Sequence, residues 1–359
     1  MGKLEKLRAV LEERGLESLI VTNDQNRRYL TGFTGSAGTV LVTKNKAFLF
    51  VDFRYVQQAQ DQATDFTVQE IDRAVMYEVI SNTLKEENIS RVGFEGKNIT
   101  YYLHSLFAKH IQAELVPVSG AVEKLRMIKL PEEIEKIKIA ASISDAAFTH
   151  ILDYIKPGIS EIDIANELEF YMRKKGATSS AFDMIIASGH RSALPHGVAS
   201  NKLIEEGDII TLDFGAYYDG YRSDMTRTIA IGQPTEEMIE IYNIVHGALE
   251  NALAHMKAGI TGKEADALTR QYIEEKGFGI QYGHGSGHGI GLDIHEDIFM
   301  STVSEDVLQE GMVLTVEPGI YLPNIGGVRI EDDVLIKEDG IEILTSSPKE
   351  LIILSMSIK

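Results

Sequence analysis

The sequence contains no cysteine. This absence excludes disulfide bonds, thiolate nucleophiles, iron–sulfur clusters and zinc sites built on cysteine sulfur. Any metal site in the chain must therefore use oxygen and nitrogen ligands, which aspartate, glutamate and histidine supply.

The sequence also has few positive charges and no long hydrophobic run. Its 35 Lys and Arg residues against 54 Asp and Glu give a formal charge of −19, which argues against binding to nucleic acid or to an anionic membrane. Leu4, Leu7 and Leu11 have helical spacing with charges between them, unlike the continuous apolar stretch of a signal peptide. No stretch is long enough to span a bilayer. We therefore expect a cytoplasmic protein.

The length of 359 residues exceeds that of a typical single domain and predicts two domains. Strands and helices alternate over about the first 120 residues, which predicts an α/β domain. The strands are expected near 18–22, 39–43, 47–51, 91–94 and 114–117, and the helices near 54–63 and 75–87. We expect the polar and aromatic stretch 26–33 to be a loop, which either lines an interface or a cleft or packs as a connector.

The boundary between the domains is marked by the start of a helix. Pro131, followed by Glu132 and Glu133, is a strong start signal, and the helix is expected to run to about residue 155. We therefore place the change of domain near residue 125. The prediction is an N-terminal domain over residues 1–125 and a second domain over residues 126–359.

The first candidate site in the second domain is the stretch Gly207–Gly232, GDIITLDFGAYYDGYRSDMTRTIAIG. It alternates like a β-hairpin around a turn near Asp219. In one register Asp213 faces Asp224 directly, and with the turn one residue later the two are diagonal neighbours on the same face. Carboxylates roughly 5 Å apart across a hairpin repel each other unless a cation lies between them. For an isolated pair, the alternative is a hairpin whose acids face water.

The second domain contains an internal repeat. Residues 156–163 (KPGISEID) resemble residues 257–264 (KAGITGKE), and both patterns are capping boxes that open a helix. Further on, residues 206–215 (EGDIITLDFG) resemble residues 310–319 (EGMVLTVEPG). Two matches in the same order predict two halves with the same succession of helix, helix, loop and hairpin.

The repeat predicts a second acidic pair. Asp213 corresponds to Glu317, and the hairpin around Asn324 sets Glu317 opposite Glu331. If the halves pack face to face, four carboxylates converge. Four converging carboxylates cannot all stay ionised without cations.

A glycine-rich stretch, GHGSGHGIGLDIHE, carries His284, His288 and His295. Its backbone is expected to approach a ligand closely, although the glycines do not match the dinucleotide pattern GxGxxG. The corresponding loop of the first half, SGHRSALPHG, carries His196 as the approximate counterpart of His295.

With Asp213, Asp224, His288, Glu317 and Glu331 assembled, the sequence resembles the pita-bread metallopeptidases, the family of methionine aminopeptidase, aminopeptidase P and prolidase. The resemblance covers residues 131–359 and depends on LDFG with SDMTRT, GHGIG with HE seven residues on, TVEPGIY and GVRIEDD. NRRYLTGFTGS and VDFRY in the first domain are similar to segments of the prolidase and aminopeptidase P branch. The implied fold is a creatinase/prolidase-like α/β N-terminal domain followed by an α+β pita-bread catalytic domain with an internal pseudo-twofold duplication.

The resemblance implies that these five residues bind two divalent metal ions, with Asp224 and Glu331 as bridging ligands. Four carboxylates and one imidazole suit Mn²⁺, Co²⁺, Zn²⁺ or Fe²⁺, of which we expect Mn²⁺. Glu317 is also expected to accept the proton of the attacking nucleophile.

The resemblance implies further roles around the metals. His295 is expected to donate a hydrogen bond to the tetrahedral oxyanion, and His196 is expected to contact the substrate. Arg329 is expected to hold ligand carboxylates, with a simple surface ion pair as the alternative. Phe182 and Tyr321, together with His196, are expected to line an apolar pocket for proline.

The implied function is that of a dinuclear-metal peptidase, expected as a homodimer, which hydrolyses the N-terminal Xaa-Pro bond of proline-containing dipeptides or short peptides. We expect an Xaa-Pro dipeptidase, although the segment Ile298–Met300 lacks the arginine that some prolidases carry there. The first alternative is an Xaa-Pro aminopeptidase acting on longer peptides. The second is a non-catalytic peptide-binding relative, against which the five retained ligand types argue.

Overall fold

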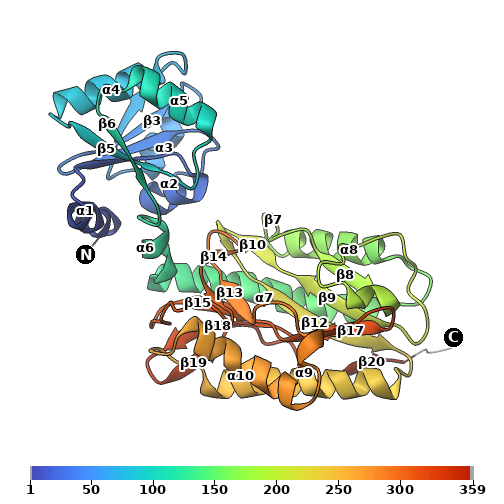
Figure 1. Cartoon of the computed structure of the whole chain (residues 1–359). Coiled ribbons are helices and arrows are strands. Elements are labelled where there is room, and N and C mark those ends of the chain that lie inside the picture. The colour runs from blue at the N-terminus through green and yellow to red at the C-terminus, as the bar shows by residue number, and fades with distance from the viewer. Residues whose placement is uncertain (1, 356–359) are drawn as a thin grey trace. The chain divides into compact units, whose positions relative to one another are not determined.

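The computed structural model describes residues 2–355 of the chain (Figure 1). The chain divides into two compact units, one ending at Arg126 and the other beginning at Met127. Within the described residues, every helix is too short or too polar to cross a membrane.

The first unit is an α/β fold with one six-stranded sheet in the order β4-β3-β2-β1-β5-β6. β2 is antiparallel to both of its neighbours, whereas β1, β5 and β6 run parallel to one another. The predicted strands and helices are confirmed to within a few residues. In chain order the elements are α1 (Lys3–Glu13), β1 (Ser18–Val21), α2 (Asp24–Thr31), β2 (Thr39–Thr43), β3 (Ala47–Val51), α3 (Val56–Gln62), β4 (Thr67–Glu70), α4 (Met76–Glu86), β5 (Arg91–Glu95), α5 (Tyr101–His110), β6 (Glu114–Val118) and α6 (Glu123–Met127).

The stretch 26–33 is not the loop that we predicted, because most of it belongs to α2. The side chain of Asn23 accepts a hydrogen bond from the Asn26 N–H at 2.9 Å and caps the start of the helix. Gly32 ends the helix with a φ of 72°, a left-handed conformation that glycine adopts without strain. The aromatic and apolar side chains of the stretch are buried, so the segment packs as a core helix.

The second unit repeats one arrangement twice. In the first half β8, β9 and β12 are adjacent strands of a four-stranded sheet, and in the second half β13, β15 and β18 occupy the same order in a five-stranded sheet. The helices α9 and α10 lie along one side of the strands and α8 lies on the other (Figure 1). Each half has its own apolar cluster.

The elements of the first half are α7 (Pro131–Tyr154), α8 (Glu161–Lys174), β7 (Ser179–Ser180), β8 (Ile185–Ser188), η1 (Gly189–Ala193), β9 (Ile209–Phe214), β10 (Ala216–Tyr218), β11 (Tyr221–Arg222) and β12 (Met225–Ile231). Those of the second half are α9 (Glu236–His255), α10 (Gly262–Glu275), η2 (Gly279–Gln281), β13 (Gly287–Gly289), β14 (Glu296–Met300), β15 (Val313–Val316), β16 (Gly319–Leu322), β17 (Gly326–Arg329), β18 (Asp332–Lys337), β19 (Gly340–Ile343) and β20 (Ile352–Leu354), of which β20 completes the sheet of the first half.

The first hairpin adopts the second of the two registers that we considered. Thr226 pairs with Asp213, so Asp224 is a diagonal neighbour of Asp213. The register follows from the turn, because Asp219 and Gly220 both have positive φ. Two such residues form the tight turn that suits the twist of a hairpin.

The second hairpin sets Glu317 opposite Glu331, as predicted. The pairs Val316 with Asp332 and Gly319 with Arg329 flank the two glutamates. The expected continuous strands are nevertheless interrupted at this point, because β15 ends before Glu317-Pro318 and β17 ends before Ile330-Glu331. Proline has no N–H to donate to a strand ladder, which accounts for the break.

The side chain of Arg227 ties the two halves together. It is 1% exposed, and its guanidinium donates to Asp332 Oδ1 at 2.7 Å and to the main-chain oxygens of Ser347 and Pro348 at 2.8 and 2.9 Å. An arginine in this position satisfies acceptors that otherwise lie buried without partners.

We predict that Arg227→Met lowers the free energy of unfolding by about 3 kcal/mol, because it leaves the buried Asp332 carboxylate without its main partner. Chemical denaturation of the metal-free protein measures the loss. Arg173→Met is the control, since Arg173 pairs with Glu169 on the surface and its side chain is 55% exposed. Equal losses in the two variants would contradict the assignment.

Candidate metal centre

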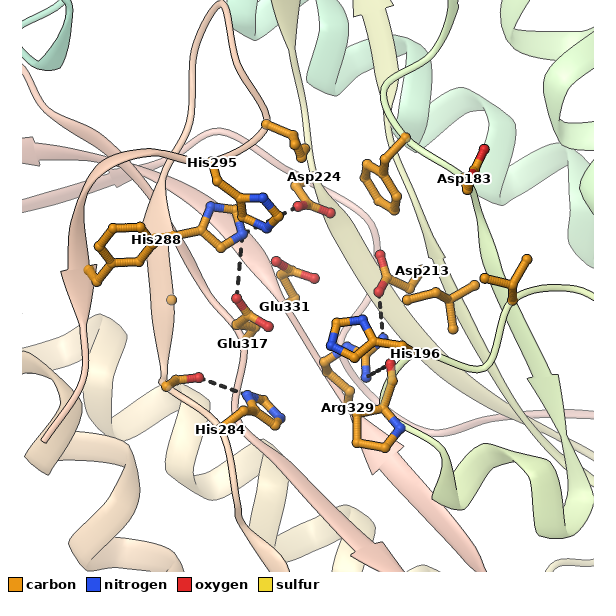
Figure 2. Close-up of a pocket in the computed structure, with 18 residues that line it drawn as sticks. Asp183, His196, Asp213, Asp224, His284, His288, His295, Glu317, Arg329 and Glu331 are labelled. Atoms are coloured by element: carbon orange, nitrogen blue, oxygen red, sulfur yellow. Dashed lines mark hydrogen bonds and ion pairs between the residues drawn. The ribbon is translucent and has the colours of Figure 1, made fainter. Parts of the chain in front are cut away.

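The two halves enclose a cavity of about 490 Å³ into which the predicted ligands converge (Figure 2). The first half supplies Asp213 from β9 and Asp224 from the residue before β12. The second half supplies His288 from β13, Glu317 from the break after β15, and Glu331 from the break before β18. All five side chains line the cavity.

Three of these residues are arranged as metal ligands are. One atom each of Asp224, His288 and Glu331 lies within 4.8 Å of the other two, which one ion can span. The Nε2 atom of His288 is 3.7 Å from Asp224 Oδ2 and 3.6 Å from Glu317 Oε1. The other ring nitrogen of His288 is 3.1 Å from the main-chain oxygen of Gly289, so Nε2 is the atom that faces the acids.

The acids of the cavity destabilise one another's ionised forms. Burial, followed by the charges of Glu331 and Asp213, raises the pKa of Asp224 well above its usual range. Burial, followed by the charges of Glu317 and Asp213, does the same to the pKa of Glu331. The pKa of Glu317 rises to about 7, chiefly through burial. A group of buried acids with raised pKa values is the expected electrostatic signature of a site built for cations.

The donor set fits divalent metal ions. The Oδ1 atoms of Asp213 and Asp224 are buried without a hydrogen-bond partner among the described residues. Buried carboxylate oxygens are normally paired or coordinate a metal. Burial, and then the nearby His295, lowers the pKa of His288 to about 4, which keeps its imidazole neutral and able to act as a ligand.

Hydrogen bonds behind the predicted ligands fix their orientation. Arg329 Nη2 donates to Asp213 Oδ2 at 2.5 Å, and Thr226 Oγ1 donates to Glu331 Oε2 at 2.6 Å. Arg329 is 3% exposed, so the arrangement is not a surface ion pair. Such partners hold ligand carboxylates in place and tune their affinity for metal.

His196 and His295 also line the cavity. The rings of His288 and His295 are 4.3 Å apart at an angle of 69°. Burial, and then the proximity of His196, lowers the pKa of His295. Figure 2 shows both histidines beside the acids, with His196 on the side of Asp213 and Arg329 and His295 on the side of Asp224.

The two predicted pocket residues occupy different places. Phe182 lines the cavity, whereas Tyr321 lies behind its wall. The Tyr321 hydroxyl accepts a hydrogen bond from Arg329 Nη1 at 2.8 Å and is 2.9 Å from His284 Nε2. Tyr321 therefore supports two residues of the wall.

His284, for which we predicted no role, also faces the cavity. Burial lowers its pKa to about 4. Its sequence signal was visible, since His284 and His288 stand in two successive GHG triplets.

Gly287 has a structural role in addition to any approach to a ligand. A Cβ atom on Gly287 would lie 2.0 Å from the main-chain oxygen of Thr315. Gly287 therefore allows β13 to lie close against β15, and this contact places His288 over the acids.

The two duplicated halves of the second unit thus form a candidate cation centre at their junction, as expected for a metal-dependent enzyme. Comparison with known families assigns it further. The chain belongs to metallopeptidase family M24, whose model matches residues 135–338, and residues 3–128 match the Creatinase/Prolidase N-terminal domain.

Relatives match over nearly the whole length of the chain. The solved structure of an Xaa-Pro dipeptidase from Bacillus anthracis is 55% identical with a TM-score of 0.97, over 98% of this chain and 99% of that one. An Xaa-Pro dipeptidase from Pyrococcus furiosus is 40% identical over 98% of this chain and 99% of its own. The structure of an X-Pro aminopeptidase from Thermotoga maritima is 41% identical with a TM-score of 0.90, over 98% and 100% of the two chains.

We predict that Asp224→Asn raises the melting temperature of the metal-free protein at neutral pH, because the raised pKa of the Asp224 carboxyl favours the unfolded chain, in which that group ionises freely. Adding MnCl2 at about 100 times the Kd should stabilise the unaltered protein by about 2.7 kcal/mol and the variant far less. Differential scanning calorimetry with and without MnCl2 measures both effects. Asp153→Asn, at an exposed position, is the matched control and should behave like the unaltered protein. A melting temperature of metal-free Asp224→Asn well below that of the metal-free unaltered protein would contradict the prediction.

Proposed function

We propose that the chain is an Xaa-Pro dipeptidase that uses two divalent metal ions. The observation that carries the proposal is the convergence of four carboxylates and one imidazole in a single cavity. Two relatives that are Xaa-Pro dipeptidases, 55% and 40% identical over essentially full length, support the choice of substrate.

In this proposal the two ions are held by Asp213, Asp224, His288, Glu317 and Glu331. A divalent ion bound there polarises the scissile carbonyl and makes water acidic enough to serve as a nucleophile near neutral pH. Mn²⁺ is the proposed ion, and Co²⁺, Zn²⁺ and Fe²⁺ suit the same donors.

Glu317 has a second role beside metal binding, and the side chains around the ligands bind the substrate and hold the ligands in place. Glu317 accepts the proton of the nucleophile. His295 donates a hydrogen bond to the oxyanion, and His196 contacts the substrate from the opposite wall. Arg329 keeps the Asp213 carboxylate in place from behind.

The preference for proline is proposed to arise from the apolar part of the wall. An Xaa-Pro bond is a tertiary amide without an N–H, so the site gains nothing from an acceptor for that group. The apolar side chains that line the cavity are Phe182, Ile185, Pro195, Val198, Ile294 and Phe299. Phe182 is the proposed contact for the proline ring, and Tyr321 acts indirectly through Arg329 and His284.

The remaining parts of the proposal concern the whole molecule. Residues 1–125 and 126–359 are the proposed domains, the chain is proposed to be a homodimer, and its proposed location is the cytoplasm. The negative charge of the chain argues against nucleic acid and anionic membranes as partners, and proline-containing peptides are the proposed partners.

We predict that the protein loaded with Mn²⁺ cleaves an Xaa-Pro dipeptide with a higher kcat/KM than the matching Xaa-Pro-Yaa tripeptide. Steady-state kinetics on the two peptides measures the ratio. An equal or higher value for the tripeptide would favour the Xaa-Pro aminopeptidase alternative, which the Thermotoga maritima relative supports.

Asp224→Asn is the negative control for this experiment. It should keep the fold, as judged by circular dichroism, and lose essentially all activity on both peptides, because one ligand oxygen becomes an amide. A protein that retains less than about one equivalent of metal after dialysis and shows no metal-activated hydrolysis would instead be a non-catalytic peptide-binding relative.

A further inference from the structure

We propose that two buried carboxylates outside the ligand set, Asp266 and Glu161, are positioning residues, each for a different part of the site. Asp266 positions the wall that carries metal ligands, and Glu161 positions the loop that carries His196. The inference deepens the proposed function and rests on its metal-dependent chemistry.

Asp266 lies on α10 and is 1% exposed. Its Oδ1 atom accepts hydrogen bonds from the Ser286 N–H at 3.1 Å and from Ser286 Oγ at 2.6 Å. Arg270 donates to both carboxylate oxygens of Asp266, at 2.6 and 2.9 Å. Asp266 does not line the cavity, so any effect on the metals passes through Ser286 and Arg270.

Ser286 connects this acid to two metal ligands. Its main-chain oxygen accepts a hydrogen bond from the Glu317 N–H at 2.9 Å, and it lies two residues before His288. Arg270 donates to the main-chain oxygen of His284 at 2.7 Å. A shift of the Asp266 side chain would therefore move the backbone on which Glu317 and His288 depend.

Glu161, at the start of α8, plays the corresponding part in the first half. It is fully buried, and its Oε1 atom accepts hydrogen bonds from Ser188 N–H and Ser188 Oγ, both at 2.8 Å. Its Oε2 atom accepts from Ser200 N–H at 3.0 Å and from Ser200 Oγ at 2.7 Å, and it is also paired with Arg191. These contacts fasten both ends of the segment that contains His196.

The two clusters have the same pattern of hydrogen bonds. In each, a single carboxylate oxygen accepts from the N–H and the hydroxyl of one buried serine. In each, the arginine that pairs with the acid also donates to a main-chain oxygen of the loop: Arg270 to His284, and Arg191 Nη2 to Val198 at 2.9 Å. The acids are not equivalent positions of the repeat, because the offset of 101 residues aligns Glu161 with Gly262.

Stability alone explains such clusters poorly. Burying an ionised carboxylate costs free energy that its partners only partly recover, and apolar replacements of buried ion pairs are often neutral or stabilising. A fixed backbone beneath the functional residues supplies the missing reason, since ligand geometry must be held within about half an ångström.

The test compares two variants of each cluster, Asp266→Asn with Ser286→Ala and Glu161→Gln with Ser188→Ala. Glu275→Gln, at an exposed position on α10, is the control. Isothermal titration of the metal-free proteins with MnCl2 gives the Kd without any activity measurement. Steady-state kinetics on an Xaa-Pro dipeptide at saturating MnCl2 gives kcat and KM.

We expect Asp266→Asn to weaken Mn²⁺ binding by about 10- to 100-fold, with a smaller loss in Ser286→Ala. Glu161→Gln and Ser188→Ala should keep the Mn²⁺ Kd within about twofold of the original. At saturating MnCl2 they should lower kcat/KM by roughly tenfold or more, because His196 is displaced from the substrate.

The proposal is overturned if the Asp266 and Ser286 variants bind Mn²⁺ like the control, or if the variants of both clusters change the Kd equally. Where Asp266→Asn or Glu161→Gln fails to fold, the serine variant of the same cluster decides. If the Kd values change as expected but even the unaltered protein does not cleave Xaa-Pro peptides, the proposed substrate is wrong, and the assignment of Asp266 to the metal wall stands on the Kd values.

Discussion

Electrostatic repulsion among four buried carboxylates is the constraint on which the catalytic unit depends. Asp213 and Asp224 come from one half and Glu317 and Glu331 from the other, and burial raises the pKa of three of them. Such a group can be fully ionised only when cations are bound, and in the metal-free chain the fold must hold the acids together against their mutual repulsion. That support comes from Arg329, Thr226 and the paired strands of the hairpins. Arg329 and Thr226 contact the acids from behind the cavity and leave other carboxylate oxygens free to face it.

Breaks in the two hairpins have the same effect, at Glu317-Pro318 and Ile330-Glu331 in the second and at Ser223-Asp224, between β11 and β12, in the first. A regular ladder would occupy the backbone around Asp224, Glu317 and Glu331 with partners in its own hairpin. Because the ladder stops there, the Glu331 N–H donates to Thr226 of the other half, and the Asp224 N–H donates to Asp333. Backbone groups that would lack partners are thus satisfied across the junction, which places acids from both halves around one cavity.

Much of the fold and of the site followed from the sequence, because the features concerned are local or repeated. The α/β alternation, the helix from Pro131 and the second acidic pair depend on periodicity, a start signal and duplication. The helix over 24–31 was missed because its charged residues obscure the apolar face, although Asn23 and Gly32 mark its ends. Tyr321 was expected in the pocket wall, and the network through Asp266 was not foreseen. Both depend on contacts between segments far apart in the chain, which no local pattern reports.

The hydrogen bond from the Glu331 N–H to the Thr226 oxygen, at 3.0 Å, has a consequence for the dynamics of the domain. It joins the halves immediately beside the proposed ligands, so local opening of either half would disturb the cavity that the two halves form together. The catalytic unit should therefore exchange its protected amide hydrogens as a single cooperative block, in which bound cations slow exchange in both halves together. The two halves of this duplicated fold are therefore expected to open and close together and not as independent units.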